Sequence, residues 1–318
     1  MASPPGAAQP LVNAHTHLEL GCFAHLCPPE GGASFVPWIL GLLKARQEIA
    51  AQGAAPFRAA AEAGIAALRA SGATTVGDIS TTGDSVEPLL DSGLSGVVYY
   101  EVLGLLRNDA LKRLDEARRR IHGWRRHEGA MRVGLTIHAP YSCHPDLFRE
   151  GVRWCLSEGV PLCVHAAESP AETKLVKYGT GGFLELLRAA GVPGFAPSGL
   201  SPIAYLEDLG VLEARPLLVH CVEVSDEDVA RIARAGASVA HCPRSNARLR
   251  CRRMPLEKFL AAGVPVALGT DSLASSPSLD VREEAEAAVT LHAGLVPPDT
   301  IRALLRASQP LTPHPSPL

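Results

Sequence analysis

Five side chains in the sequence could together hold a metal ion. His15 and His17 lie two residues apart in the segment Asn13-Ala14-His15-Thr16-His17. In a β-strand, residues i and i+2 point to the same side, so the two imidazoles would share one space. Histidine nitrogens and carboxylate oxygens suit a borderline ion, and we expect Zn²⁺ here with Fe²⁺ as the alternative. The other three side chains each follow a run of apolar residues, and they are His165, His220 and Asp271.

Each of these patterns also has an ordinary structural explanation. An HxH pair can be structural, and a single histidine after three apolar residues is more often a hydrogen-bonded core residue than a ligand. Burying several imidazoles and a carboxylate together is costly, however, unless a cation compensates them. Because the pattern recurs at four strand ends, the sequence favours a metal site.

The elements that must position these side chains are predicted by alternating runs of residues. From residue 11 onward, short β-rich runs alternate with periodic stretches rich in Ala, Leu and Arg. Such alternation predicts a parallel sheet with right-handed crossovers, and eight units predict closure into a (β/α)₈ TIM-type barrel. A doubly wound open sheet is the alternative. Strands are expected at 11–20, 73–80, 95–104, 131–140, 161–169, 216–224, 237–246 and 264–272. Helices are expected at 57–70, 109–127, 145–158, 226–235 and 255–262.

A barrel of this kind would gather the candidate ligands at its C-terminal face, where barrel enzymes build their sites. Two segments outside the pattern, a long loop at 21–34 and an extension at 191–213, are expected at the same face. We expect residues 11–307 to form one barrel domain. Residues 1–10 and the Pro-rich residues 308–318 are expected to be disordered tails.

Composition excludes several classes of protein. A formal net charge of −3 with 20% charged residues gives no reason to expect nucleic acid or an anionic membrane as partner. The eight cysteines form no CxxC pair, which indicates reduced thiols rather than a disulfide framework. The N-terminal segment lacks the features of a signal peptide, and no apolar run is long enough to span a bilayer. We therefore expect a soluble, cytoplasmic protein that acts on a small molecule.

The motifs in combination resemble the mononuclear deaminase branch of the amidohydrolase superfamily, which also contains triazine hydrolases. They are the HxH pair, His165-x-x-Glu168, His220 and the Gly-Thr-Asp-Ser segment 269–272, and the likeness covers residues 11 to about 290. The resemblance implies that His15, His17, His165 and Asp271 bind one metal ion. It also implies that Glu168 shuttles protons and that His220, with Asp271, orients the attacking water.

The fourth predicted strand lacks the lysine that would indicate a site for two metal ions. Binuclear members of the superfamily use a carbamylated lysine there, and residues 131–138 contain no lysine. Glu101 ends the third predicted strand and could in principle bridge two ions. Because the sequence resembles this superfamily but lacks that lysine, we expect one metal ion. Three nitrogen ligands and one carboxylate would leave a coordination position of that ion open for water.

Within this branch the sequence is most similar to deaminases of adenosine-type nucleosides with altered 5′ groups. These are the S-adenosylhomocysteine/methylthioadenosine deaminases and the aminodeoxyfutalosine deaminases. The segments that carry the likeness are 15–19, 138–142, 165–169 with Glu172, and 241–246. The resemblance implies substrate contacts by Glu19, His138, Arg244 and Asn246, with His138 at the ribose hydroxyls. Alternatively, residues 244–246 form a loop held by its own hydrogen bonds. His241 is expected to be structural, and Cys221 and Cys242 to be packing residues.

The sequence departs from its branch at both ends. Members usually carry a small β-sandwich built from strands before and after the barrel, and the residues typical of its later strands are missing here. The flanking sandwich is therefore expected to be absent or truncated, either in a barrel-only variant or in a truncated or frameshifted chain. Apolar surface left uncovered would favour a homodimer.

The function predicted from these observations is hydrolytic deamination of an aminopurine nucleoside or a related amino-heterocycle, with release of ammonia. One alternative is hydrolysis of another C–N bond or of a C–Cl bond, as in triazine hydrolases. Another is a catalytically silent barrel that serves as a binding protein. Glu168 argues against the silent barrel, since a scaffold has no need of a carboxylate at that position.

Overall fold

The computed structural model describes residues 10–29, 31–50, 53–189, 191–192 and 194–311. Eight parallel strands follow one another around a barrel in chain order, and each pairs with the next. Thr16 in the first strand bridges to Asp271 after the eighth, which brings the two ends of the sheet together. The predicted (β/α)₈ barrel is confirmed. The strands are β1 Leu11–Thr16, β2 Ala73–Ser80, β3 Ser95–Val102, β4 Met131–Ile137, β5 Leu162–Ala166, β6 Leu217–His220, β7 Ser238–His241 and β8 Val266–Leu268.

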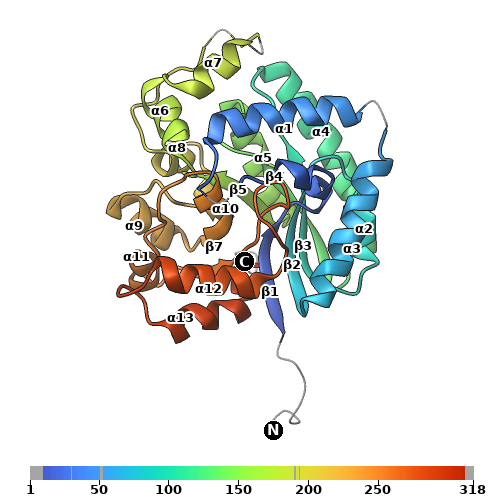
Figure 1. The fold of residues 1–318 in the computed structure, drawn as a ribbon. Helices are drawn as coiled ribbons and strands as arrows, with labels where there is room; N and C mark the ends of the chain where they lie inside the picture. The colour runs from blue at the N-terminus through green and yellow to red at the C-terminus, as the bar shows by residue number, and fades with distance from the viewer. Residues whose placement is uncertain (1–9, 30, 51–52, 190, 193, 312–318) are drawn as a thin grey trace.

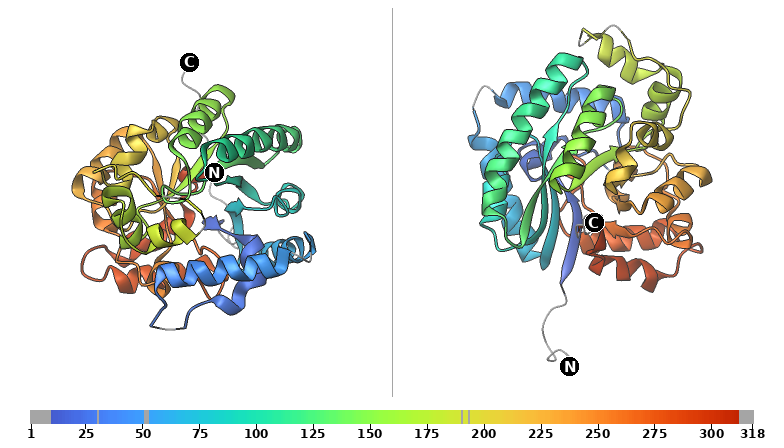
Figure 2. Two further views of the ribbon diagram at one scale, coloured as in Figure 1. Left: turned by 90° about the horizontal axis from the view of Figure 1, so that it is seen from above. Right: turned by 180° about the vertical axis from the view of Figure 1, so that it is seen from behind.

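Helices surround the strands on the outside, as the view along the barrel shows (Figure 2). The α-helices are α1 Phe35–Ala50, α2 Ala55–Ala70, α3 Val86–Leu90, α4 Arg107–Trp124, α5 Pro145–Glu158, α6 Pro170–Tyr178, α7 Gly182–Ala189, α8 Pro202–Asp208, α9 Asp226–Ala235, α10 Pro243–Arg248, α11 Leu256–Ala261, α12 Val281–Leu291 and α13 Pro298–Ala303. The 3₁₀ turns are η1 Leu18–Leu26, η2 Arg125–His127, η3 Val211–Ala214, η4 Leu304–Arg306 and η5 Gln309–Leu311. All five predicted helices are present: α5 and α9 have the predicted bounds, and the ends of α2, α4 and α11 differ from the prediction by at most three residues.

The connection between β1 and α2 is more ordered than the sequence indicated. The segment 21–34 was expected to be a long loop, but its first part belongs to η1, which begins directly after His17. Helix α1 follows and lies at the end of the barrel where the strands terminate (Figure 1). Phe23 of η1 and Leu42 of α1 are buried in one apolar cluster with Phe57 of α2. This cluster fastens α1 to the rim of the barrel.

The core has two layers. Inside the barrel, side chains such as Val12, Ile79 and Tyr99 fill the axis, and Cys163 and Cys242 lie among them. Between the strands and the helices lies the larger outer layer. Cys221 is buried in that outer layer, so both cysteines that follow site histidines are packing residues, as predicted. All eight cysteines are free thiols.

The C-terminal end of the described chain is folded onto the bottom of the barrel. Residues 309–311 were expected to belong to a disordered tail, but they form η5. The Leu311 side chain is buried within the inner cluster, close enough to Gly77 that a Cβ there would lie 2.9 Å from Leu311 Cδ2. The remaining tail predictions, for residues 1–9 and 312–318, lie outside the described residues.

Within the described part of the chain, every strand belongs to the barrel, so these residues build no β-sandwich. The described helices include none that is both long enough and apolar enough to cross a membrane.

The packing of Leu311 gives a test of this description. Leu311→Ala removes a side chain that is only 5% exposed. We expect the free energy of unfolding to fall by about 2 kcal/mol, the lower end of the range for buried leucines, because a site near the chain end can relax. Urea titration measures this change. Leu295→Ala, at a side chain that is 53% exposed, is the control and should change little. Equal stability of the two variants would contradict the packing of η5.

Candidate metal centre and active site

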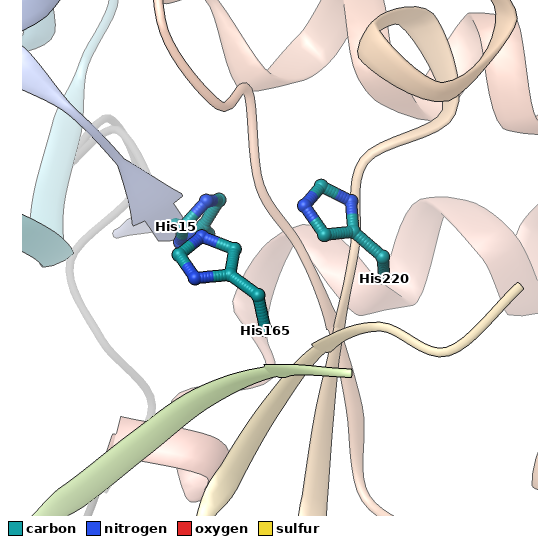
Figure 3. A group of neighbouring side chains, drawn as sticks. All are labelled: His15, His165 and His220. Carbon is teal, nitrogen blue, oxygen red and sulfur yellow. The ribbon is translucent and has the colours of Figure 1, made fainter. Parts of the chain in front are cut away.

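The predicted ligands converge at the carboxyl ends of the strands. His15 and His17 come from the end of β1, His165 from β5, and Asp271 from the turn after β8. His17 Nε2 lies 3.2 Å from His165 Nε2, while Asp271 Oδ1 lies 3.6 Å from His15 Nε2 and 3.7 Å from His17 Nε2. His15, His165 and His220 point toward one another (Figure 3). The structure therefore brings all the predicted ligands together.

The donor set fits a cation. His165 Nδ1 lies 3.1 Å from the carbonyl oxygen of His138, which can only accept, so Nδ1 carries the proton and Nε2 offers a lone pair. That lone pair faces His17 Nε2, and the buried His15 Nε2 has no hydrogen-bond partner among the described residues. Burial holds the pKa of both His17 and His165 well below the ordinary value. Neutral imidazoles with unshared lone pairs are the form that binds metal.

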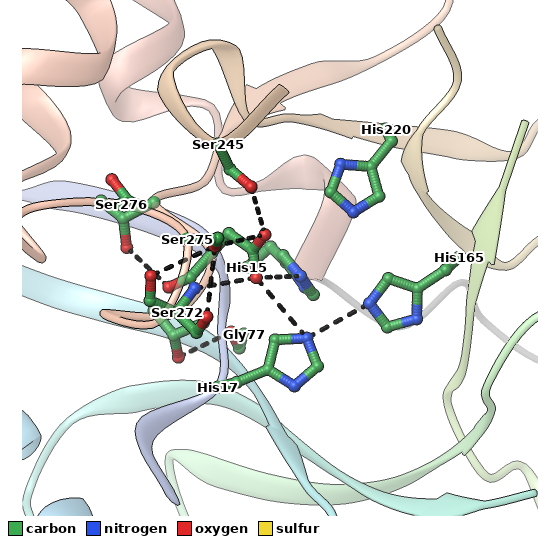
Figure 4. Close-up of polar contacts among 12 residues, drawn as sticks. His15, His17, Gly77, His165, His220, Ser245, Ser272, Ser275 and Ser276 are labelled. Carbon is green, nitrogen blue, oxygen red and sulfur yellow. Dashed lines mark hydrogen bonds and ion pairs between the residues drawn. The ribbon is translucent and has the colours of Figure 1, made fainter. Parts of the chain in front are cut away.

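Asp271 is held in place by three donors. Ser245 Oγ donates to Oδ2 at 2.5 Å, Ser275 Oγ donates to Oδ2 at 2.9 Å, and the Ser272 amide donates to Oδ1 at 2.8 Å (Figure 4). Burial acts to raise the pKa of Asp271, but its contacts with the site histidines hold it well below the usual range. The carboxylate is therefore charged, and Oδ1 is the oxygen that faces His15 and His17.

Backbone strain is concentrated at the same strand ends. Ala167, His220, Cys221 and Asp271 all have positive φ, at 52°, 75°, 47° and 59°. Non-glycine residues rarely adopt this left-handed conformation, and it persists where the surrounding structure enforces it. The chain thus turns sharply after β5, β6 and β8, and these turns aim the side chains at one point.

Glu168 and His220 form a pair beside the predicted ligands. Glu168 Oε1 lies 3.3 Å from His220 Nε2, and both side chains are buried. Burial raises the pKa of Glu168 well above its ordinary value, reinforced by the negative charges of Asp271 and Glu172. Burial lowers the pKa of His220 to about 4. A carboxyl group whose pKa is raised from its acidic value suits proton transfer, which is the role predicted for Glu168.

Asn246, which was predicted to contact the substrate, contacts His220 in the structure through its side-chain oxygen. Its Oδ1 accepts a hydrogen bond from His220 Nδ1 at 2.9 Å. This contact places the His220 proton on Nδ1 and leaves Nε2 free to accept. Asn246 therefore sets the tautomer of His220.

Two further residues that were predicted to contact the substrate have side chains engaged by other parts of the chain. Both oxygens of Glu19 are occupied, since they accept from Ser80 Oγ and from the backbone amides of Thr81, Thr82 and Ser85. Glu19 therefore shapes the loop after β2 and does not line the pocket.

Arg244 is likewise engaged away from the pocket. Its guanidinium pairs with Glu283 and Glu284 and donates to Ser278. Residues 243–248 form α10, and Arg244 ties this helix to α12 and to the segment before it, so residues 244–246 are not a loop held by its own hydrogen bonds. His241 reaches outward to His292, with their Nε2 atoms 3.1 Å apart, and so has the expected structural place.

The pocket above the site contains residues that the sequence prediction missed. His138 lines it, as predicted, together with Tyr141, Leu249 and Glu101. One wall comes from α1, whose contributing residues follow helical spacing and are Phe35, Trp38, Ile39, Leu42 and Arg46. The recurrence of apolar residues at i, i+3, i+4 and i+7 was the signal that could have identified this wall.

A second cluster of possible ligands, Glu101, His138 and His165, shares a residue with the first. His165 Nδ1 already donates to a carbonyl, so His165 can offer a metal only Nε2. That nitrogen faces His17. His165 can therefore serve only one of the two clusters.

Comparisons with known proteins agree with this site. Residues 10–309 match the model of the amidohydrolase family. Aminodeoxyfutalosine deaminase of Deinococcus radiodurans is 38% identical over 312 residues, which cover 95% of this chain and 72% of that protein. 5-Methylthioadenosine/S-adenosylhomocysteine deaminase of Symbiobacterium thermophilum is 32% identical over 215 residues, which cover 66% of this chain and 45% of that protein.

Solved structures show the same barrel. Helicobacter pylori aminofutalosine deaminase in complex with methylthio-coformycin has a TM-score of 0.81 at 26% identity, covering 95% of this chain and 73% of that one. Atrazine chlorohydrolase TrzN from Arthrobacter aurescens TC1 complexed with zinc has a TM-score of 0.78 at 22% identity, covering 95% and 70%, and shows the fold alone.

The barrel and its converging histidines and aspartate are those of a metal-dependent hydrolase, and the chain belongs to the amidohydrolase family. Within the family, the relatives named above that are at least 30% identical are deaminases. The resemblance inferred from the motifs is confirmed.

The ligand set can be tested by elemental analysis of purified protein. We expect about one equivalent of Zn²⁺ or Fe²⁺ in the parent chain and strong loss of metal in His15→Ala and Asp271→Ala. His138→Gln is the matched control, because His138 belongs only to the second cluster, and it should keep the ion. Two tightly bound equivalents, both needed for activity, would refute a mononuclear site.

Proposed function

We propose that this protein is a metal-dependent deaminase that replaces the amino group of an aminopurine nucleoside by hydrolysis and releases ammonia. The observation that carries the proposal is the pairing of Glu168 with His220 beside the ligand cluster. The identity to two nucleoside deaminases over most of the barrel supports it. We propose His15, His17, His165 and Asp271 as ligands of a single Zn²⁺, with Fe²⁺ as the alternative.

An ion bound by these four residues would supply Lewis acidity that makes water a nucleophile near neutral pH. His220, with its proton fixed on Nδ1 by Asn246, accepts a hydrogen bond at Nε2 and so orients the attacking water. Glu168 accepts a proton from that water and donates it to a ring nitrogen; it then accepts a second proton from the newly attached hydroxyl and donates that one to the departing amine. Asp271, which its serine donors hold in place, accepts a hydrogen bond from the same water and so helps His220 to orient it.

The pocket supports a nucleoside rather than a small triazine. Aromatic and aliphatic side chains from α1 provide an apolar wall for a flat heterocycle. The Glu101 carboxylate lines the same pocket; it is buried and makes no hydrogen bond or ion pair with any described residue. His138 directs Nδ1 to Ser142, so its Nε2 remains available beside Glu101. A free carboxylate beside a free imidazole nitrogen suits sugar hydroxyls, which a triazine lacks.

We place the substrate among adenosine-type nucleosides with an altered 5′ group, as the names of the relatives suggest. Hydrolysis of a triazine C–N or C–Cl bond is the second candidate within the same chemistry, and the solved chlorohydrolase shares the fold. A cytoplasmic location and a homodimer remain predictions.

A substitution at Glu168 tests whether the protein catalyses a reaction or only binds a ligand. Glu168→Gln keeps the shape of the side chain but removes the proton carrier, and since Glu168 is not a ligand, metal content should stay near that of the parent. A proton shuttle contributes about 10²–10⁴-fold to rate, and one group serves several transfers here, so we expect a loss of about 10⁴-fold in kcat. Ammonia release over aminopurine nucleosides, pterins and triazines is the measurement.

Two results would contradict the proposal. Activity of the Gln variant within about tenfold of the parent would remove Glu168 from the mechanism, since proton shuttles contribute more. A metal-loaded parent that releases ammonia from none of these compounds but still binds one would favour the silent binding protein.

Glu101 tests the proposed sugar contact. Hydrogen bonds to a charged group contribute about 1.5–3 kcal/mol, which corresponds to roughly ten- to a hundredfold. Glu101→Gln should therefore lower kcat/KM for the nucleoside by at least about tenfold, mainly through KM. The free nucleobase is the control substrate, because it lacks the hydroxyls and should lose little. An equal loss for both substrates would assign Glu101 to the chemistry or the fold.

A further inference from the structure

A buried carboxylate next to the candidate active site has no part in the chemistry described above. Glu172 lies in the first turn of α6, and its side chain is fully buried. Its Oε1 accepts from the Ala167 amide at 2.9 Å, and its Oε2 accepts from the Glu168 amide at 2.8 Å. Both oxygens therefore bind the backbone of the turn that carries Glu168.

This arrangement differs from ordinary helix capping in the same molecule. In a capping box the third residue of the helix accepts from the backbone of the cap residue. Helix α9 does this, since Asp228 accepts from the amide of its cap residue, Ser225. Glu172 holds the equivalent position after the cap residue Ser169 but reaches one and two residues further back. It binds the turn that precedes the helix.

The turn held by Glu172 is joined to the turn after β6. The carbonyl of Ala167 accepts from the amides of Val222 at 2.9 Å and Glu223 at 2.7 Å. The carbonyl of Ala166 accepts from the amide of Cys221 at 3.0 Å. Ala167 at one turn has positive φ, as does His220 at the other. The left-handed Ala167 thus points its amide at Glu172 and its carbonyl at the His220 turn.

We propose that Glu172 is a positioning residue that fixes Glu168 relative to His220. The two side chains meet at 3.3 Å although they stand on turns after different strands. The hydrogen bonds from Glu172 through Ala167 to the second turn set that separation. This inference rests on the proposed function for its kinetic readout, but its structural readout is independent of activity.

The test compares Glu172→Gln with Asp228→Asn, the matched change at the capping position of α9. The Gln variant replaces one acceptor oxygen by an amide that cannot accept from the facing N–H. We expect metal content to stay at the parent level and kcat to fall roughly ten- to a hundredfold with KM changed less than about threefold, because misplacement of a catalytic group by about 1 Å is enough. Asp228→Asn should leave kcat unchanged.

A double-mutant cycle shows whether Glu172 acts through Glu168. In a Glu168→Gln background, the added Glu172→Gln change should reduce kcat little further, since residues that act as a unit are not additive. Full additivity would overturn the proposal. If the Gln variant does not fold, Glu172→Asp, which keeps the charge but is one methylene too short to reach both amides, gives the same comparison.

A crystal structure of Glu172→Gln decides the question even if the parent proves inactive. We expect the turn at Ala167 to move and the contact between Glu168 and His220 to be lost. An unchanged turn with an unchanged contact would overturn the positioning role whatever the kinetics show. An inactive parent whose variant shows the displaced turn would leave the positioning role standing and remove the proposed deaminase activity.

Discussion

Imidazole nitrogens and a carboxylate buried together at the strand ends are the constraint on which this site depends. His165 Nε2 and His17 Nε2 meet at 3.2 Å, and the charged Asp271 lies beside them in a buried place. Such a cluster is costly to bury without a compensating cation. The barrel makes the cluster possible because parallel strands end together at one face, so residues hundreds of positions apart arrive at one point.

The turns that follow the strands determine the exact positions of the site side chains. The pleat of a strand decides only which face of the sheet a side chain points to. The positive φ values after β5, β6 and β8 turn the backbone further and so set the direction of the side chains in the site. Each strained residue is held by neighbours: Ala167 by Glu172 and by the amides of the next turn, and Asp271 by its serine donors and the carbonyl of His15. The geometry of the site is therefore a property of the loops and strand ends together.

The sequence predicted what periodicity and residue type can reveal. Apolar runs gave the eight strands and their order, and polar residues at the strand ends gave His15, His17, His165, His220 and Asp271. All the predicted strands except β2 run past their observed ends, by two to five residues. After β6 and β8 the left-handed turns at His220 and Asp271 have no glycine to mark them, and after β7 the residues 243–246 belong to α10.

The substrate contacts were harder to predict, since a polar side chain near a motif can have partners far along the chain. Glu19 is saturated by amides more than 60 residues away, and Arg244 by acids about 40 residues away, as the sequence separations of 62 and 40 show. Conversely, Trp38 and Arg46 line the pocket from α1, whose helical spacing of apolar residues indicates a buried face but not what that face contacts. Their positions follow from how α1 packs on η1, which depends on tertiary contacts.

Helix α1 joins two parts of the molecule that lie far apart in the sequence. Its side chains form one wall of the pocket above the candidate ligands. The indole of Trp38 also donates a hydrogen bond to the carbonyl of Ala274 at 3.1 Å, within the turn whose Ser272 and Ser275 hold Asp271. A substitution at Trp38 would therefore alter the wall of the pocket and the support of Asp271 together.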